Sequence, residues 1–142
     1  MSNRRTSSSR TYLERALVAA RAAIDKKALE PVLIDLTQQK SYADYLLLCS
    51  AQSGRAVKAI AEHIVEAMAE LGVRPIGTEG VRDGRWALID FGDLVVHVFD
   101  HPLREFYDLD GMWFDAPRIP LEVPPDQRIG PSGLLDYNLA TE

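Results

Sequence analysis

The sequence contains little cysteine, no long apolar run and no excess of positive charge. Its single cysteine, Cys49, can form neither an internal disulfide nor a thiolate-rich metal site, and this predicts a reducing compartment and a cytoplasmic location. The longest uncharged apolar stretches, such as residues 45–49, have about five residues, whereas a helix needs about 20 to cross a bilayer. We therefore expect no membrane span and no membrane partner.

Basic residues are outnumbered by acidic ones. The chain has 16 Lys and Arg against 21 Asp and Glu, so its formal net charge is -5. Its isoelectric point is about 5.2. Because neutralising phosphates requires clustered Lys and Arg, this balance disfavours a general or sequence-specific nucleic-acid binder. A basic protein surface is a better matched partner.

The length and composition fit one globular domain. The 142 residues are 46% hydrophobic and 26% charged, which is ordinary for a folded domain. Residues 1–10 are rich in Ser, Thr and Arg, and we interpret them as a mobile N-terminal tail. Residues 118–142 are rich in proline and lose periodicity, which predicts an extended C-terminal tail whose apolar residues from Leu134 to Leu139 could dock on the fold. The folded domain is then 11–117.

Two amphipathic helices are predicted. A stripe of Leu13, Ala16, Leu17, Ala20 and Ile24 indicates a helix over 11–27, and Pro31 is expected to end it. A second helix opens at Ser53, buries an apolar face and stops at Gly72, a residue typical of left-handed helix ends. The buried face of this second helix is expected to contain Val57, Ile60, Ala61, Ile64, Met68 and Leu71.

Five strands are predicted around these helices, at 32–36, 45–50, 73–77, 85–91 and 93–99. A short link makes the first two antiparallel neighbours, and the helix between the second and third implies a right-handed parallel crossover. The last two form a hairpin across Gly92-Asp93. The fold class is therefore α/β, a mixed five-stranded sheet in αββαβββ order with helices on one face.

The hairpin is the most informative region. Alternation places Trp86, Leu88 and Asp90 on one face and Ala87, Ile89 and Phe91 on the other. A tryptophan that shares its face with a charge, near Arg104 and Tyr107, fits a recognition surface better than an interior position.

Reactive chemistry is less well supported. Asp90, Asp93 and His97 could ligate a metal, but paired aspartates at a hairpin end are common turn residues. Ser53-Gly54-Arg55 could bind an anion, although a serine helix cap explains it as well. No glycine-rich phosphate loop is present, and Cys49 follows buried leucines, where a thiol is unreactive.

Two blocks of residues, taken in order and spacing, resemble the ribosomal silencing factor family, RsfS or Iojap, from about Leu13 to Trp113. The first block is Ser41-Tyr42-Ala43-Asp44-Tyr45, then Ser53, Arg55, Val57, Ala59, Ile60 and Ala61. The second is Glu79-Gly80, Gly84-Arg85-Trp86, Leu88, Asp90, Gly92-Asp93, Val95-Val96-His97-Val98-Phe99, Arg104, Phe106-Tyr107, Leu109 and Trp113.

This resemblance implies a nucleotidyltransferase-like fold with no enzymatic activity and no cofactor. It implies binding to large-subunit ribosomal protein fourteen (uL14), which blocks subunit joining and represses translation when nutrients are scarce. The partner-binding residues it implies supply apolar area, charge or polarity; they are Trp86, Tyr107, Asp44, Asp90, Asp93, His97 and Arg104. Asp44 and Arg104 could equally fix the fold through internal pairs.

The chain departs from the family pattern at Ala51, Ala56 and Asp110-Gly111. The first two departures weaken a nucleotide site, and the third leaves the rim of the partner surface undefined. Two other interpretations remain open. One is a divergent metal-dependent nucleotidyltransferase or phosphohydrolase that uses Asp90, Asp93 and His97, and the other is a homodimer that covers its own sheet face when free.

Overall fold

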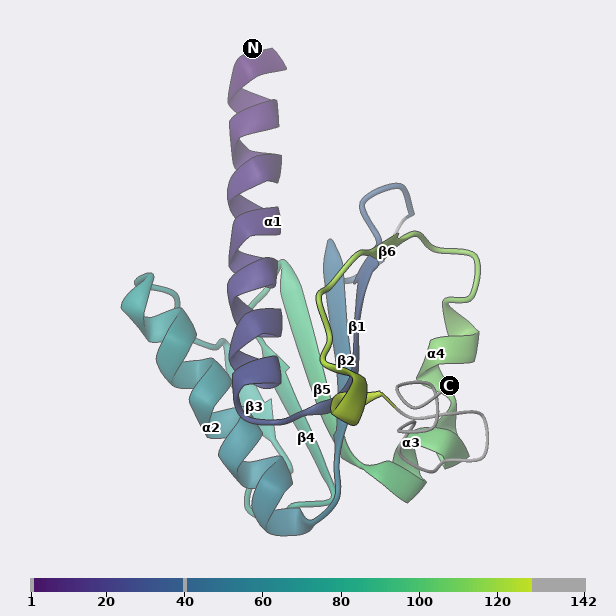
Figure 1. Ribbon diagram of the computed structural model, residues 1–142. Coiled ribbons are helices and arrows are strands. Elements are labelled where there is room, and N and C mark those ends of the chain that lie inside the picture. The colour runs from purple at the N-terminus through teal and green to yellow at the C-terminus, as the bar shows by residue number, and fades with distance from the viewer. Residues whose placement is uncertain (1, 40, 129–142) are drawn as a thin grey trace.

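The computed structural model describes the backbone of residues 2–39 and 41–128, and the side chains of these residues from Thr11 onward. Helices lie on both sides of a six-stranded mixed sheet (Figure 1). The elements are α1 (Ser2–Asp25), β1 (Leu29–Asp35), β2 (Tyr45–Ala51), α2 (Gly54–Glu70), β3 (Gly77–Glu79), β4 (Trp86–Asp90), β5 (Leu94–Asp100), α3 (His101–Tyr107), α4 (Leu109–Met112), β6 (Arg118–Ile119) and a 3₁₀ turn, η1 (Pro125–Gln127).

The strand order is β3-β4-β5-β2-β1-β6. β1 and β2 are antiparallel neighbours, and β4 and β5 form the expected hairpin. β2 and β5 pair in parallel at the centre of the sheet. β3 also runs parallel to β2, but β4 and β5 lie between them. The third strand begins at Gly77, later than the expected 73–77, because Val73 to Ile76 form the loop that leads into it.

The second helix matches its prediction closely. The Ser53 hydroxyl accepts a hydrogen bond from the backbone N–H of Ala56 at 3.1 Å, which caps the start of α2. Gly72 has a φ of 77°, the left-handed conformation that ends such helices. The buried face of α2 consists of Val57, Ile60, Ala61, Ile64 and Met68, whereas the expected Leu71 is exposed.

The first helix differs from its prediction at both ends. Its backbone is helical from Ser2, inside the segment expected as a tail, and it ends at Asp25. Pro31 does not end it but lies buried in β1, where the pairing with β2 shifts register between Leu29 and Val32. A bulge of this kind tolerates the missing N–H of proline. Along α1, buried alanines at 16, 19, 20 and 23 belong to the core that α1 shares with α2.

The sheet is covered on both faces, not on one as expected. α1 and α2 cover one face, and α3 and α4 lie against the other (Figure 1). The second core contains Ile34, Leu46, Leu48, Val95 and Phe99 from the strands, with Leu103, Leu109 and Trp113 packed against them. The sequence prediction missed these helices because they are short and lack a long apolar stripe.

The proline-rich segment contributes to the fold as far as the structure describes it. Arg118–Ile119 pair with β1 as a sixth strand, so the sheet has one strand more than predicted. The buried side chain of Gln127 donates hydrogen bonds to the carbonyl oxygens of Ile24 (3.1 Å) and Ala28 (2.9 Å). It thereby satisfies one backbone acceptor in the last turn of α1 and one just beyond it. The region from Leu134 to Leu139 lies outside the described residues.

Arg104 is an internal tie, not a surface charge. Its side chain, 5% exposed, donates to the carbonyl of Glu30 at 2.7 Å and to the hydroxyl of Ser50 at 3.1 Å. Its guanidinium also forms two hydrogen bonds with the Asp110 carboxylate, at 3.0 and 2.9 Å. One side chain therefore joins β1, β2, α3 and α4. Of the two readings left open for Arg104, the structure shows the internal pair.

We expect the substitution Arg104→Met to lower the free energy of unfolding by about 3 kcal/mol, because it leaves Asp110 and two backbone or hydroxyl acceptors without their donor. Urea denaturation followed by circular dichroism measures this. The exposed Arg55 makes no contact of this kind with any residue that the structure describes, so Arg55→Met should stay within about 0.5 kcal/mol of wild type. Equal losses in the two variants would contradict this role of Arg104.

Candidate partner-binding surface

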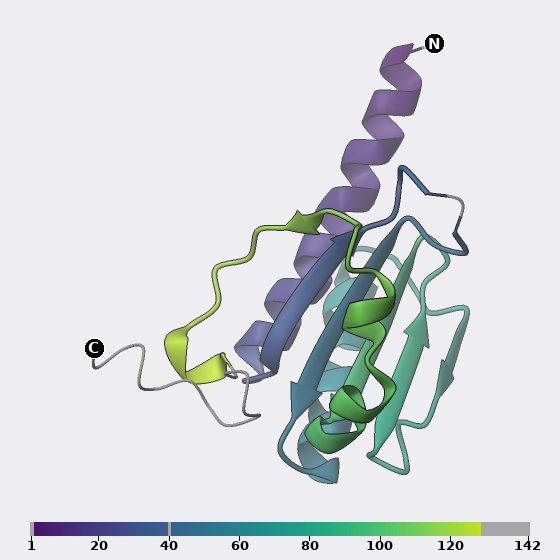
Figure 2. The same cartoon turned by 90° about the vertical axis from the view of Figure 1, so that its right-hand side faces the viewer.

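The exposed part of the second sheet face is the candidate site. α3 and α4 lie in front of the central strands, whereas β4 and β3 remain to one side of them (Figure 2). Trp86 and Leu88 project from β4 onto this face and are half-buried. The alternation predicted for the hairpin is confirmed, since Ala87, Ile89 and Phe91 lie in the core beneath α1 and α2.

Trp86 stands at the centre of a cluster of four rings. Its indole Nε1 donates a hydrogen bond to Nδ1 of His97 at 2.9 Å. Its ring centroid lies 4.9 Å from that of Phe99 and 4.8 Å from that of Tyr107. His97 stacks on Phe99 with centroids 5.8 Å apart and planes at 10°. Two buried rings and one hydrogen bond thus hold the indole in a single orientation.

His97 supports Trp86 from below. It is 4% exposed, so it lies beneath the surface and not on it. Because Nδ1 accepts the indole proton, the neutral ring carries its own proton on Nε2, which has no hydrogen-bond partner among the residues described. Burial lowers the pKa of His97 to about 4. The ring therefore stays neutral, and remains an acceptor, at neutral pH.

Two glycines determine where the chain enters β4. Gly80 and Gly84 have φ values of 76° and 71°, in the left-handed region. A Cβ on Gly80 would overlap the carbonyl oxygen of Trp86, and a Cβ on Gly84 would meet the backbone of Gly54 at 2.7 Å. The backbone N–H of Asp100 donates to the carbonyl of Arg85 at 2.7 Å and closes the hairpin at this end. The loop from Gly80 to Arg85 therefore fixes Trp86.

A cleft of about 280 Å³ lies beside this tryptophan. Tyr107, 48% exposed, forms part of its wall together with the indole. The residues that line it are Gly80, Asp83, Arg85, Trp86, Leu103 and Tyr107. The cleft combines apolar side chains with the charged Asp83 and Arg85, an arrangement that suits an anchor side chain from a partner.

The three predicted aspartates lie at the other end of the hairpin. Where β4 pairs with β5, Trp86 lies opposite Phe99 at one end of the two strands, and Asp90 lies opposite Val95 at the other end. Asp90 accepts from the N–H of Gly92 at 2.8 Å, the turn role favoured by its spacing. The carbonyl of Asp93 accepts from the N–H of Asp44 at 2.9 Å, so these residues adjoin. Partial burial and the charge of Asp90 raise the pKa of the nearby Tyr42.

This geometry separates the proposed charged residues from the proposed aromatic ones.

In the part of the chain that the structure describes, no three His, Cys, Asp or Glu side chains are placed to hold a metal ion. Cys49 is fully buried, and burial raises the pKa of its thiol to about 12. No helix among the described residues is long and apolar enough to span a membrane.

Several exposed apolar residues were missed by the sequence interpretation. Phe106, Met112 and Phe114 are exposed on and just after α3 and α4, near Tyr107 in the chain. The ring of Phe106 contacts that of Tyr107 with centroids 5.1 Å apart. Pro102 in the first turn of α3 was the available signal for a helix here. Phe106 extends the apolar area around Trp86 and Tyr107, and we call these three residues, together with the cleft beside Trp86, the aromatic surface.

Comparison with known proteins decides the family. The family model "Ribosomal silencing factor during starvation" matches residues 9–132. The chain belongs to the ribosomal silencing factor family. The RsfS protein of Bacillus subtilis is 39% identical over 105 residues, which cover 74% of this chain and 89% of that protein. The chloroplastic Iojap protein of Arabidopsis thaliana is 28% identical over 75% of this chain and 44% of its own length.

Solved structures support the same family fold. A crystal structure of a protein from Chromobacterium violaceum has a TM-score of 0.70 at 30% identity, covering 79% of this chain and 92% of that one. A crystal structure of a protein from Bacillus halodurans has a TM-score of 0.65 at 36% identity, covering 73% and 94%. The mixed α/β sheet described here is therefore the fold shared with these proteins.

We expect the stability of this silencing-factor domain to fall by about 3 kcal/mol more between pH 6.5 and pH 4 in wild type than in His97→Asn. The pKa of His97 is lowered on folding, so the unfolded chain takes up a proton in this window and the folded chain does not. The stabilisation is complete above about pH 6.5 and is lost as the pH falls toward 4.

Urea unfolding at several pH values measures this difference. Asparagine retains a carbonyl acceptor for the indole but does not titrate. The half-buried His63 on α2 supplies a control, since His63→Asn removes an imidazole away from the aromatic surface. If His97→Asn and wild type lose stability in parallel, the buried imidazole is not the group responsible.

Proposed function

We propose that this protein binds the large ribosomal subunit through the aromatic surface, contacts ribosomal protein fourteen there, and prevents the small subunit from joining. Translation is thereby repressed when nutrients are limiting. Membership of the ribosomal silencing factor family supports the ribosome as the target. The protein acts as a binder and not as an enzyme, in keeping with the name of its relatives.

The observation that carries the proposal is the fixed orientation of Trp86. Its hydrogen bond to the buried His97 and its contact with the buried Phe99 restrain the indole before any partner arrives. An anchor that is already ordered loses little side-chain entropy on binding. Trp86 and the exposed Tyr107 therefore suit the centre of an interface, where a few aromatic residues contribute most of the binding energy.

Charge contributes to the proposed interface in a different way. Asp44, Asp90 and Asp93 are partly exposed around the β4–β5 turn, and a basic ribosomal protein would face them favourably. Such charges accelerate and orient association more than they strengthen it, and salt screens them. Arg104 and His97 act from inside the fold, since they hold the helices and the indole that form the surface.

The free protein would leave this apolar area open to water. Apolar patches of this kind are commonly covered by a partner, so we propose that two free copies pair through the aromatic surface and separate on the ribosome. Repression by this protein requires no catalysis, because the small subunit cannot occupy the surface of the large subunit that the protein already covers.

Co-sedimentation with separated ribosomal subunits tests the function directly. We expect the purified protein to pellet with the large subunit alone, less so as salt is raised, and to inhibit joining of added small subunits. Pelleting with neither subunit at low salt, or pelleting with no effect on joining, would overturn the proposal.

The substitution Tyr107→Ala should weaken large-subunit binding by roughly 30-fold, equivalent to about 2 kcal/mol, because an exposed aromatic anchor is removed. Leu71→Ala removes a side chain of equal exposure, 48%, at the far end of α2 and should leave binding unchanged. Fluorescence anisotropy with labelled protein and purified large subunits gives both constants. Comparable weakening by the two substitutions would argue against this location of the interface.

A further inference from the structure

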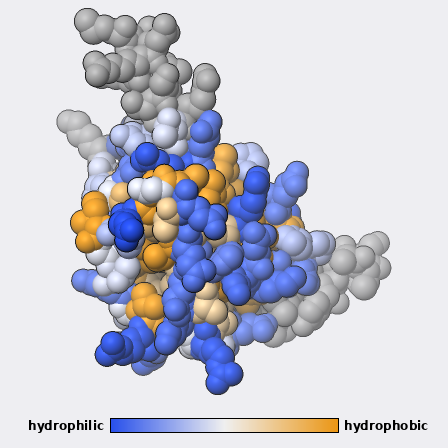
Figure 3. Space-filling view, turned by 90° about the vertical axis from the view of Figure 1, so that its left-hand side faces the viewer, coloured by the Kyte–Doolittle hydropathy of each residue, from blue (hydrophilic) through white to orange (hydrophobic). Residues whose placement is uncertain are grey.

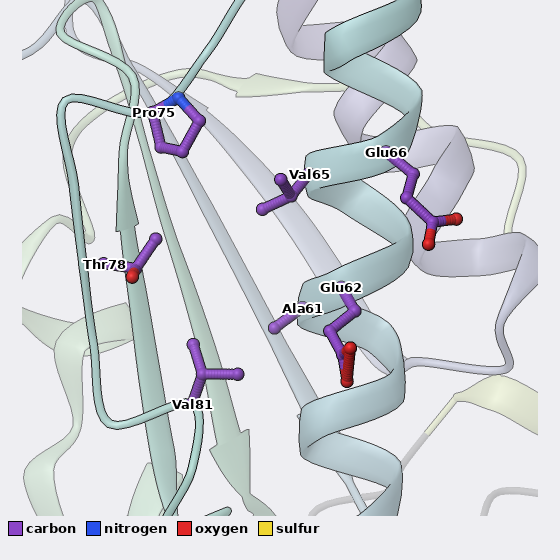
Figure 4. A pocket seen from close by; sticks show the side chains of 7 residues that line it. All are labelled: Ala61, Glu62, Val65, Glu66, Pro75, Thr78 and Val81. Carbon is purple, nitrogen blue, oxygen red and sulfur yellow. The ribbon is translucent and has the colours of Figure 1, made fainter.

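A second surface feature lies on the opposite side of the sheet, where α2 approaches the edge strand β3. It is a pocket of about 440 Å³, lined by Ala61, Glu62, Val65, Glu66, Pro75, Thr78 and Val81. Val65 and Ala61 point from α2 toward a wall formed by Pro75, Thr78 and Val81 (Figure 4). We call it the β3 pocket. On this side of the molecule, hydrophobic patches interrupt a largely hydrophilic surface (Figure 3).

The strand beside this pocket has an open edge. β3 is the terminal strand, pairs only with β4 among the described residues, and has all three residues exposed. Edge strands are often protected by short length, charged side chains, proline or a bulge. β3 is short and contains Glu79, but it contains neither lysine nor proline. Because β3 is short, it offers few backbone hydrogen bonds. An added strand would need further contacts, and the adjoining pocket provides apolar area for them.

The charges at the pocket are of one sign. Glu62 and Glu66 are exposed on α2, one helical turn apart, and neither makes an ion pair or hydrogen bond with the residues that the structure describes. Among the residues that the structure describes, no cationic side chain lines the pocket. An occupant with Lys or Arg next to an apolar group would therefore complement both the lining and the rim.

We propose that the β3 pocket binds an extended segment of a partner protein, which adds as a strand beside β3. One apolar side chain of this segment lies between Val65 and Val81, and Lys or Arg side chains flank it near Glu62 and Glu66. Backbone hydrogen bonds and the apolar contact provide the affinity in this mode of recognition. The exposed ion pairs chiefly set direction and specificity.

The reach of basic side chains is compatible with an extended segment at this site. Alternate residues of a strand point to the same side and lie about 6.6 Å apart. The four-residue step from Glu62 to Glu66 along α2 advances about 6 Å. The two basic residues of such a segment, two positions before and two after the apolar residue, lie about 13 Å apart, so their long side chains must converge on Glu62 and Glu66, which are about 6 Å apart along α2. A peptide in this register has the pattern basic-x-apolar-x-basic.

This site lies on the other side of the sheet from the proposed ribosome contact, although Val81 belongs to the loop that leads into β4. Thr78 and Val81 lie on the side of the sheet that α2 covers, whereas Trp86 and Tyr107 lie on the side of α3. Both surfaces can be occupied at once, and substitutions in the β3 pocket should leave large-subunit binding unchanged. Failure of one proposal therefore does not decide the other.

A displayed library of random heptapeptides, selected on the full-length protein, tests the inference. We expect enriched peptides to share the basic-x-apolar-x-basic pattern. In ¹⁵N spectra, a synthetic peptide from this set should shift the amides of Thr78, Glu79 and Val65 and not that of Trp86. The double substitution Glu62→Lys/Glu66→Lys should weaken its binding at least tenfold, whereas Glu70→Lys, on the same helix outside the pocket, should change it less than twofold.

Val65→Ser provides the second variant. It removes apolar lining without changing charge, and it should also weaken the peptide at least tenfold while thermal melting shows a folded protein. Selection without enrichment, or enrichment of peptides without basic residues, would overturn the proposal. So would amide shifts confined to the aromatic surface, or equal weakening by Glu70→Lys, because general electrostatic attraction would then account for the binding.

Discussion

The buried guanidinium of Arg104 is the contact on which the second face of the sheet depends. Its donors reach the carbonyl of Glu30, the hydroxyl of Ser50 and the carboxylate of Asp110, so strands and short helices meet at one side chain. Two effects act in opposite directions on the pKa of Asp110. Burial raises the pKa of Asp110, but the hydrogen bonds and charge of Arg104 outweigh it and leave that pKa lowered. The pair is therefore ionised at neutral pH, and it fixes α3, which carries Tyr107, against the sheet.

From that tie, the organisation of the aromatic surface follows step by step. α3 brings Tyr107 to Trp86, the loop between Gly80 and Arg85 sets the entry of β4, and His97 holds the indole from within the sheet. An imidazole that is kept neutral by burial can accept this hydrogen bond, whereas a protonated one could not. Residues that never reach the surface thus determine how its central aromatic residue is presented to a partner.

The parts of this fold that sequence could predict are those governed by local patterns. The helical period of α2, with its cap at Ser53 and its end at Gly72, was sufficient to predict this helix and its buried face. The alternation along β4 was sufficient to predict which side chains face the core. The internal role of Arg104 was harder to predict, because a charged residue is usually exposed and the carbonyl of Glu30 that it binds lies 74 residues away in the chain. Pairing of Arg118–Ile119 with β1 is equally non-local. The aromatic surface could be predicted in part, since Trp86 and Tyr107 were identified and Phe106 was not, and its separation from the aspartates depends on strand register.

The positions of the tryptophans have an optical consequence. The chain has two, Trp86 and Trp113, and both pack against the core on the α3 side of the sheet, with none on the side of α1 and α2. Tryptophan emission of the unlabelled protein, excited at a wavelength that tyrosine does not absorb, therefore originates from one face only. A molecule that docks on that face alters the environment of the emitting rings, whereas one that docks behind α2 leaves them in place. Tryptophan fluorescence of the unmodified protein thus distinguishes binding on one side of the sheet from binding on the other.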